Sequence, residues 1–467
     1  MRPRVISLLA AGGAVSLFVA VLAVVIGAGR AESPRPSPTI VSIGGAKVTT
    51  VPPPTRAVVT SNFPDPDVIK VGNTYYAYAT NDNGVRLPIA TASSLGGPWT
   101  RQVGDGLAGL GAWAAEGHTW APDVSPRGDG TFLLYYTARL KNTEDQCIGV
   151  AVAASPLGPF DPVGAEPLIC PLGHGGAIDP AAFVDTDGTR YLLFKSDSFS
   201  ALHPAAIYLQ RMSADGLRPE GSPRRILVRD REPTLIEAPA MVKRGGKYVL
   251  FYASGVFFNS SYRTGYAEAS SIIGPYVKAD RSLLSTDGYR DKVIGPGGAD
   301  IVADANGDHI VFHGILGFLG GRRVIRGMFV ADLAWANGRP VVRGSPTRYE
   351  AERGRLDNCI ARAERTASAD AAVGYLDYPD SGVAVSVYAP AAGGYAVRVR
   401  YANRGTRPAA HGLRVNGAAV ATLTYSAVHA GQWRTTTAVH VALRAGWNTL
   451  YVHRVTGQAE LDYIEVA

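Results

Sequence analysis

The sequence has 467 residues, too many for one compact domain, so we expect two or three domains. Its 54 glycines and 31 prolines exceed average usage and follow no Gly-X-Y period, which excludes collagen and predicts many turns between short strands. The net charge of +7 comes from scattered lysines and arginines; with neither a basic stripe nor a nucleic-acid-binding motif, we expect no nucleic-acid partner.

Residues 1–31 have the layout of an export signal. Two arginines precede an uncharged stretch over residues 5–29, and small residues follow near a cleavage point. The stretch is also long enough to span a bilayer. We favour a cleaved signal peptide, and an uncleaved N-terminal membrane anchor is the competing interpretation. Both place the rest of the chain outside the cytoplasm, secreted or held at a membrane. Residues 32–58 contain six prolines and are predicted to form an extended, semi-rigid linker.

A glycine turn followed by an aromatic-rich strand then recurs five times. The turn glycines are spaced 58, 58, 58 and 61 residues apart, at Gly72, Gly130, Gly188, Gly246 and Gly307. A Gly-Pro-aromatic triplet keeps the same period, with its prolines at Pro98, Pro159 and Pro275. Repeats of this length predict four-stranded propeller blades, whereas a β-sandwich would need both spacings to coincide by chance. We therefore predict an all-β chain in which residues 59–345 form a five-bladed β-propeller.

One carboxylate precedes each turn glycine by 7 or 9 residues, at Asp65, Asp123, Asp179, Glu237 and Asp300. Equivalent positions on successive blades face the propeller axis, so we expect all five acids in one central funnel. Gathered carboxylates repel each other and are costly to desolvate, so stability does not favour the arrangement. We interpret Asp123 and Asp300 as turn caps or ligands of a structural ion, and the other three as functional.

Two of these acids suit the cleavage of a glycosidic bond, which needs one ionised and one protonated carboxyl group. Glu237 lies in the apolar run Leu235-Ile236-Glu237-Ala238, which would raise its pKa and suit a general acid. Asp65 lies in a polar, turn-rich segment that favours an ionised base. These arguments alone do not select Asp65 over Asp123.

Four motifs resemble those of glycoside hydrolase family 43, the five-bladed arabinanases, arabinofuranosidases and xylosidases. They are Phe63-Pro64-Asp65-Pro66-Asp67-Val68, Trp120-Ala121-Pro122-Asp123-Val124, Ile178-Asp179-Pro180 and Ile236-Glu237-Ala238-Pro239. The resemblance implies Asp65 as general base, Glu237 as general acid and Asp179 as the residue that tunes the acid. It also implies inversion of the anomeric centre, with roughly 6.5–9.5 Å between the carboxyl groups, and no cofactor for catalysis.

The chain departs from this family at one motif. Many members carry a histidine after a Gly-Pro-Gly turn, where this sequence reads Gly295-Pro296-Gly297-Gly298. His313 matches an axial histidine that approaches a bound ion in relatives. An ion on the propeller axis is therefore an open alternative to a purely structural histidine, and His313 is kept among the candidate substrate-binding residues.

Aromatic side chains near the acids are candidate platforms for sugar rings. Trp120 is favoured because it precedes Asp123 by three residues, and Asp123 itself is a candidate contact. Trp113 and Phe257 are further candidates, with core packing as the alternative for each aromatic residue. The predicted partner is a polysaccharide or oligosaccharide substrate.

The cysteines predict one disulfide. Cys147 and Cys170 flank the third strand of the second repeat and the connection after it, where antiparallel strands bring such a pair within reach. An exported protein permits the oxidation. Cys359 is left as a thiol, and no Cys/His spacing fits zinc.

Residues 349–467 lose the repeat and show alternating strands separated by short turns, which predicts an antiparallel β-sandwich. Its opening and closing segments resemble carbohydrate-binding modules of families 35 and 6. The resemblance implies a structural calcium held by Glu350, Glu352 and Asp462; the alternative is that two of these acids face solvent.

These features together predict a secreted, inverting glycoside hydrolase of arabinose- or xylose-containing polysaccharide, with a carbohydrate-binding module. An α-L-arabinofuranosidase or arabinanase is favoured. The alternatives are a β-xylosidase and a non-catalytic carbohydrate-binding protein of the cell surface; the latter has no need of the three acids.

Overall fold

The computed structural model describes residues 39–43, 46–50, 56–197, 204–289, 291–336, 338–343, 347–368, 371–389 and 392–467. Within these ranges the chain is almost entirely β-structure, and the helical segments are two short 3₁₀ turns, η1 (Leu172–His174) and η2 (Ala351–Arg353). No described helix is long and apolar enough to cross a membrane. The predicted export signal or anchor lies outside the described residues.

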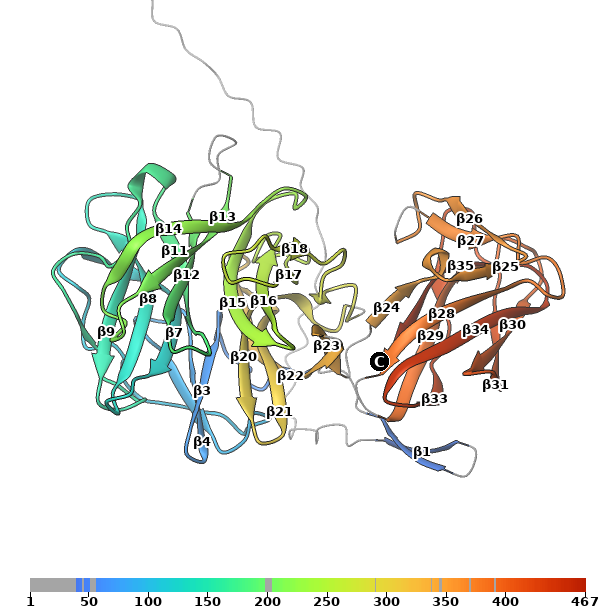
Figure 1. Ribbon diagram of the computed structural model, residues 1–467, viewed down its shortest axis with the longest axis horizontal. Coiled ribbons are helices and arrows are strands. Elements are labelled where there is room, and N and C mark those ends of the chain that lie inside the picture. The colour runs from blue at the N-terminus through green and yellow to red at the C-terminus, as the bar shows by residue number, and fades with distance from the viewer. Residues whose placement is uncertain are drawn as a thin grey trace, which may run out of the picture. The chain divides into compact units, whose positions relative to one another are not determined.

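Five antiparallel sheets follow one another along the chain (Figure 1). The first contains β3 (Asp67–Val71), β4 (Thr74–Tyr78), β5 (Ile89–Ala92) and β6 (Thr100–Arg101). The second contains β7 (Ala114–Pro126), β8 (Phe132–Leu140), β9 (Gln146–Ala153) and β10 (Asp161–Pro162). The third contains β11 (Ala177–Val184), β12 (Arg190–Ser196), β13 (Ala206–Met212) and β14 (Pro219–Val228). The fourth contains β15 (Ile236–Arg244), β16 (Lys247–Ser254), β17 (Arg263–Ala269) and β18 (Val277–Lys278), with β19 (Leu284–Ser285) also paired to β17. The fifth contains β20 (Ile294–Asp304), β21 (Gly307–Leu319), β22 (Arg323–Ala336) and β23 (Arg339–Arg343).

The repeated glycines form the turn between the first two strands of each sheet. All five have positive φ, from +59° at Gly72 to +124° at Gly307. A Cβ added at any of them would meet no atom within 4 Å, so glycine is needed there for its backbone conformation rather than for space. The strands that follow are buried and aromatic-rich, as at Leu133, Leu134 and Tyr135, none of which is exposed. The glycine period therefore marks one blade per repeat, as predicted.

The first strands of successive sheets lie side by side in a ring: β3 next to β7, then β11, β15 and β20, which lies next to β3 again. The segment before β3 closes this ring by pairing with β22 of the last sheet. The amide of Met328 donates to the carbonyl of Val59 (3.1 Å), and the amide of Phe63 donates to the carbonyl of Arg326 (2.7 Å). The predicted five-bladed propeller is confirmed.

The C-terminal domain is a sandwich of two antiparallel sheets. One contains β24 (Thr347–Glu350), β26 (Ile360–Ala363), β27 (Ala371–Gly374), β29 (Gly393–Ala402), β32 (Arg434–Thr435), β33 (Val439–Leu443) and β35 (Glu460–Val466). The other contains β25 (Arg355–Asp357), β28 (Gly382–Ala389), β30 (Ala409–Val415), β31 (Ala418–Tyr425) and β34 (Gly446–Thr456). Alternate residues of both sheets, such as Val397 and Val399 on β29 and Leu450 and Val452 on β34, form one buried apolar core. The predicted sandwich is therefore confirmed.

The structure also tests the predicted disulfide and the predicted linker. Cys147 and Cys170 form a disulfide, and Cys359 is free, as predicted.

The linker prediction needs a correction, because β1 (Thr39–Ile43) and β2 (Ala46–Thr50) pair as an antiparallel hairpin within residues 32–58. Most of these ten positions hold β-branched residues (Val, Ile and Thr), which favour a strand pair over an extended spacer.

Candidate active site

In the first strand of each blade, or just before it in the first blade, lies a residue with positive φ at which the backbone kinks. These residues are Asp65 (51°), Ala121 (42°), Asp179 (54°), Ala238 (47°) and Gly298 (59°). The first four precede a proline. The pairing with the second strand shifts register at this point in the four blades from the second to the fifth. Such irregularities re-aim side chains and occur often near active sites.

This alignment corrects the prediction that the five spaced acids are equivalent. Asp65 and Asp179 occupy the kink itself, and Glu237 directly precedes it. Asp123 and Asp300 lie two residues after the kink, as does Asp67. The axial acids therefore form two groups, which we call the upper group (Asp65, Asp179 and Glu237) and the lower group (Asp67, Asp123 and Asp300).

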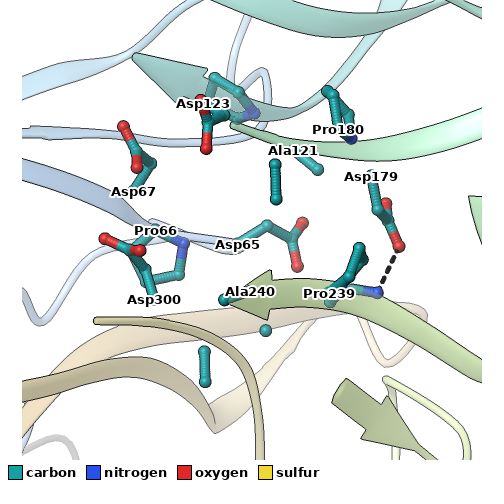
Figure 2. A pocket seen from close by; sticks show the side chains of 15 residues that line it. Asp65, Pro66, Asp67, Ala121, Asp123, Asp179, Pro180, Pro239, Ala240 and Asp300 are labelled. Atoms are coloured by element: carbon teal, nitrogen blue, oxygen red, sulfur yellow. Dashed lines mark hydrogen bonds between the residues drawn. The ribbon is translucent and has the colours of Figure 1, made fainter. Parts of the chain in front are cut away.

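One pocket on the axis receives side chains from all five blades, and its lining includes Asp65, Asp179 and all three acids of the lower group. Figure 2 shows the carboxyl groups of Asp67, Asp123 and Asp300 gathered on one side, while those of Asp65 and Asp179 point the other way. The two groups therefore present separate sets of carboxyl oxygens to the pocket.

Asp65 is held as a carboxylate. Arg326 on β22 donates to Oδ1 (2.9 Å), and Thr80 donates to Oδ2 (2.7 Å). Burial alone would raise the pKa of Asp65, but the Arg326 charge, the neighbouring His313 ring and the hydrogen bond from Thr80 outweigh it and hold the pKa well below its usual value. An ionised carboxylate at this position can accept a proton.

His313 and Tyr262 fill the space beside Asp65. His313 Nδ1 accepts the backbone amide of Asp65 (3.1 Å), and its ring stacks on Tyr262 with centroids 5.5 Å apart and 7° between the planes. Burial lowers the pKa of His313 to about 4, and the charge of Arg326 adds to this, so the ring is neutral at pH 7. A Cβ at Gly297 would lie 2.2 Å from the Tyr262 ring, and one at Gly298 would lie 2.7 Å from His313. The Gly-Gly pair that departs from the family pattern thus makes room for these two rings.

Glu237 on β15 is held between a phenol and a lysine. Tyr262 donates its hydroxyl to Oε1 (2.8 Å), and Nζ of Lys195 on β12 lies 3.6 Å from Oε2. Burial raises the pKa of Glu237; Lys195 and the Tyr262 hydrogen bond oppose the shift without reversing it. Glu237 is therefore suited to hold a proton closer to neutrality than an ordinary glutamate.

Asp179 on β11 connects the third and fourth blades. Its Oδ2 accepts the backbone amide of Ala238 (2.8 Å), the residue next to Glu237, as the dashed line in Figure 2 marks. Burial, with the nearby charge of Glu237, raises the pKa of Asp179 to about 8. Asp179 therefore fixes the backbone that carries Glu237, and its role in tuning the acid stays a prediction.

The lower group connects neighbouring blades in a regular way. Asp67 accepts the amide of Val124 (2.9 Å), Asp123 that of Ala182 (2.9 Å) and Asp300 that of Val68 (3.0 Å). Burial raises the pKa of Asp123 to about 7 and that of Asp300 to about 6. The predicted turn-capping role is thus replaced by hydrogen bonds between blades.

The aromatic residues predicted to bind sugar rings differ in how far they are buried. Trp113 is 7% exposed and packs in the apolar core, stacked on Tyr136, so its assignment as a sugar platform is corrected. Trp120 is half-buried, edge-to-face with His118 at 5.5 Å. Phe257 is 41% exposed, and the guanidinium of Arg326 lies 4.9 Å from its ring centroid. Since Arg326 also binds Asp65, Phe257 lies near the pocket, and sugar contacts of Trp120, Phe257, Asp123 and His313 stay predictions.

Sequence reasoning missed three polar residues of this site: Thr80, Lys195 and Arg326. None belongs to a motif, and Arg326 lies 261 residues from the carboxylate it binds. A polar residue in an otherwise apolar second strand, as Lys195 is in Leu192-Leu193-Phe194-Lys195, was the available signal.

Glu350 and Asp462 of the C-terminal domain meet at Ser368, and Glu352 lies on η2. Ser368 Oγ lies 2.8 Å from Glu350 Oε2 and 2.7 Å from Asp462 Oδ1, and Arg400 pairs with Asp462. Burial raises the pKa of Glu350 and of Glu352, whose Oε2 is buried without a partner. The oxygen donors suit a hard cation. In the described part of the chain, however, no three such side chains are arranged to hold a metal, so calcium here stays a prediction.

Comparisons with known proteins agree with this division of the chain. Residues 54–340 match the family described as glycosyl hydrolases family 43, and residues 347–467 match carbohydrate binding module (family 35). The extracellular endo-alpha-(1->5)-L-arabinanase 1 of Bacillus subtilis strain 168 is 30% identical over 293 residues, covering 59% of this chain and 86% of that protein.

Two solved structures share the propeller fold. A thermostable family-43 glycoside hydrolase has a TM-score of 0.54 at 27% identity, covering 61% of this chain and 93% of its own. An endo-1,4-beta-xylanase from Bacteroides thetaiotaomicron VPI-5482 has a TM-score of 0.52 at 25% identity, covering 62% and 96%.

Proposed function

The chain belongs to glycosyl hydrolases family 43, and from this premise we propose that it is a secreted, inverting hydrolase of α-1,5-linked arabinan. The observation that carries the proposal is the difference between two carboxyl groups of one site. Arg326 holds Asp65 ionised, while burial favours the protonated form of Glu237. A base and an acid are thereby available at the same pH.

In the proposed reaction, Asp65 accepts a proton from a water molecule whose oxygen attacks the anomeric carbon. Glu237 gives its proton to the glycosidic oxygen as the carbon–oxygen bond breaks. One water is consumed, and the anomeric configuration inverts because attack and departure occur on opposite faces. Asp179 orients Glu237 through the amide of Ala238.

The preference for arabinan rests on relatives. The Bacillus subtilis protein is named an endo-arabinanase, and so are proteins of Aspergillus flavus and Aspergillus oryzae that are 28% identical over 272 residues. The xylanase named among the structural neighbours supports xylan as the second candidate. Secretion is supported by the word extracellular in the name of the Bacillus protein and by the composition of residues 1–31, and anchoring through an uncleaved segment is the alternative.

We further propose that residues 349–467 bind the polysaccharide and keep the catalytic domain near it, as the match to a carbohydrate-binding module suggests. Binding to an insoluble polysaccharide would raise the local substrate concentration for the propeller.

The test is hydrolysis of debranched arabinan, arabinoxylan, xylan and the nitrophenyl glycosides of arabinofuranose and xylose. We expect release of arabinose or arabino-oligosaccharides, with the first-formed anomer inverted by proton NMR. Asp65→Asn and Glu237→Gln should each abolish most turnover while leaving the melting temperature within a few degrees. Release of xylose alone would establish the second candidate, and a retained anomer would refute the mechanism.

A further inference from the structure

Lys195 is an unusual residue for the interior of a blade. Its side chain has no exposed surface and lies on β12 among apolar neighbours. Its Nζ lies 3.3 Å from Asp197 Oδ1 and 3.6 Å from Glu237 Oε2. Burying an ammonium group is costly even when it is paired, so stability gives little reason for a lysine at this position.

The charges around Glu237 show what the lysine can do. Asp65 and Arg326 face it as a neutralised pair, and Tyr262 contributes a hydroxyl, His313 a neutral ring and Asp179 a carboxyl whose pKa is raised to about 8. In the proposed reaction Glu237 begins protonated and uncharged. After giving up its proton it is a buried carboxylate, and Lys195 is the cation in contact with it whose charge Asp65 does not already neutralise.

We propose that Lys195 is a positioning residue that stabilises the carboxylate formed on Glu237 during proton donation, with Asp197 setting how much of the lysine's charge acts on Glu237. This inference rests on the proposed role of Glu237 as general acid. A counter-charge already in place costs no reorganisation at the moment of reaction. The lysine lowers the pKa of the acid, and Asp197 limits the effect so that Glu237 still holds its proton before the reaction.

The proposal predicts a dependence on the leaving group. Leaving groups that depart as stable anions need little help from an acid, whereas a sugar hydroxyl needs full proton transfer. A weaker acid would therefore slow natural substrates far more than activated ones.

The experiment compares Lys195→Met and Asp197→Asn with the unaltered protein. Substrates are arabinan and aryl α-arabinosides whose phenols range from dinitrophenol to unsubstituted phenol. For Lys195→Met we expect a loss of about a hundredfold on arabinan and only a few-fold with dinitrophenol. The alkaline limb of kcat/KM should move up by about one pH unit. Asp197→Asn should move that limb down, a change of opposite sign that general destabilisation would not produce.

Lys278→Met is the matched control. Lys278 is also buried and paired with two acids, Asp230 (2.5 Å) and Glu232 (2.7 Å), but neither of them belongs to the axial acids. It should lower the melting temperature without changing the leaving-group dependence or the pH profile. Lys195→Arg, which retains the charge, should recover part of the lost activity.

Equal losses on all leaving groups with an unmoved alkaline limb in Lys195→Met would overturn the inference and leave Glu237 as acid intact. Full activity of Glu237→Gln would instead overturn the proposed function, and this inference with it. Movement of both limbs by Lys278→Met would show that the profile reports stability, and would also overturn the role of Lys195.

Discussion

Tyr262 and His313 stack face to face, 5.5 Å apart, and each touches a different member of the proposed acid–base pair. The Tyr262 hydroxyl binds Glu237, and His313 accepts the amide of Asp65. The separation of acid and base therefore depends on a pair of packed rings as well as on the blades that carry them.

Substitutions at Tyr262 should separate its packing from its hydrogen bond. Tyr262→Phe keeps the stack and removes one hydrogen bond, so we expect a loss of about tenfold in kcat with an unchanged melting temperature. Tyr262→Leu also removes the stack, and should lower both kcat and the melting temperature further. The measurements are steady-state kinetics and thermal unfolding; identical kinetics for the two variants would mean that the stack does not position the pair.

Replacement of Arg326 should move the acidic limb of the activity profile. Because Arg326 lowers the pKa of Asp65, Arg326→Met should raise that pKa, and the base should then lose its charge at a higher pH. We expect the acidic limb of kcat/KM to shift upward by at least one unit. Arg323→Met is the control, since Arg323 lies on the same strand but pairs with Asp82. An unmoved limb in Arg326→Met would contradict the assignment of Asp65 as base.

The lower group should make stability depend on pH. The pKa values of Asp123 and Asp300 are raised from 3.8 to about 7 and about 6, so both bind a proton more tightly in the folded protein than in the unfolded chain. Their ionisation therefore favours unfolding, and their contribution to the free energy of unfolding falls as the pH rises from about 4 to 7.

Asp123→Asn should flatten this decline, because the amide oxygen can still accept the Ala182 amide without ionising. We expect its melting temperature to equal that of the unaltered protein at pH 4 and to exceed it by several degrees at pH 8. Asp129→Asn, at an exposed turn position, should leave the slope unchanged above pH 4. A steeper decline in Asp123→Asn would show that its charge is stabilised by something other than these contacts.

Trp113 and Phe257 should respond in opposite ways to truncation. Trp113→Ala removes a large core ring and should destabilise the fold by about 3–5 kcal/mol. Phe257→Ala removes a partly exposed ring beside Arg326, so it should raise KM several-fold with little change in melting temperature. Denaturant unfolding and steady-state kinetics distinguish the two effects, and an unaltered KM in Phe257→Ala would remove Phe257 from the substrate contacts.

Calcium should stabilise the C-terminal domain if Glu350, Glu352 and Asp462 hold it. We expect the unfolding transition of this domain in the full chain to fall by several degrees in excess chelator and to recover with calcium. Glu352→Gln should abolish that dependence, whereas Asp65→Asn should retain it. A transition that does not respond to chelator would mean that Asp462 is held by Arg400 and Ser368 without calcium.

The sequence predicted the blades because each repeat carries its own local requirement, a glycine with positive φ before an aromatic strand. It also located Asp65, Asp179 and Glu237, since each lies in a recognisable motif. Counting back from the turn glycine misaligned these acids between blades. The number of residues between the kink and the turn glycine differs from one blade to another. The proline after Asp65, Ala121, Asp179 and Ala238 marks the kink and would have aligned four of the five blades correctly.

The partners of these acids were beyond sequence reasoning for a physical reason. Arg326 and Lys195 are single cations on second or third strands, and only the closed ring brings them to the axis. The burial of Trp113 could not be predicted from the sequence either, because aromatic residues occur both in blade cores and in sugar-binding sites.

The closure of the ring has a consequence for how the enzyme becomes active during folding. The segment that pairs with β22 ends two residues before Asp65, and the β22 residue that accepts the Phe63 amide is Arg326 itself. The hydrogen bond that joins the first blade to the last therefore also brings the guanidinium to Asp65, the proposed base. A nascent chain with four finished blades carries every acid of the upper group, but it lacks Arg326, which lies on β22 of the fifth blade. If Asp65 is the base, as proposed, hydrolysis therefore requires that the two ends of the propeller have met.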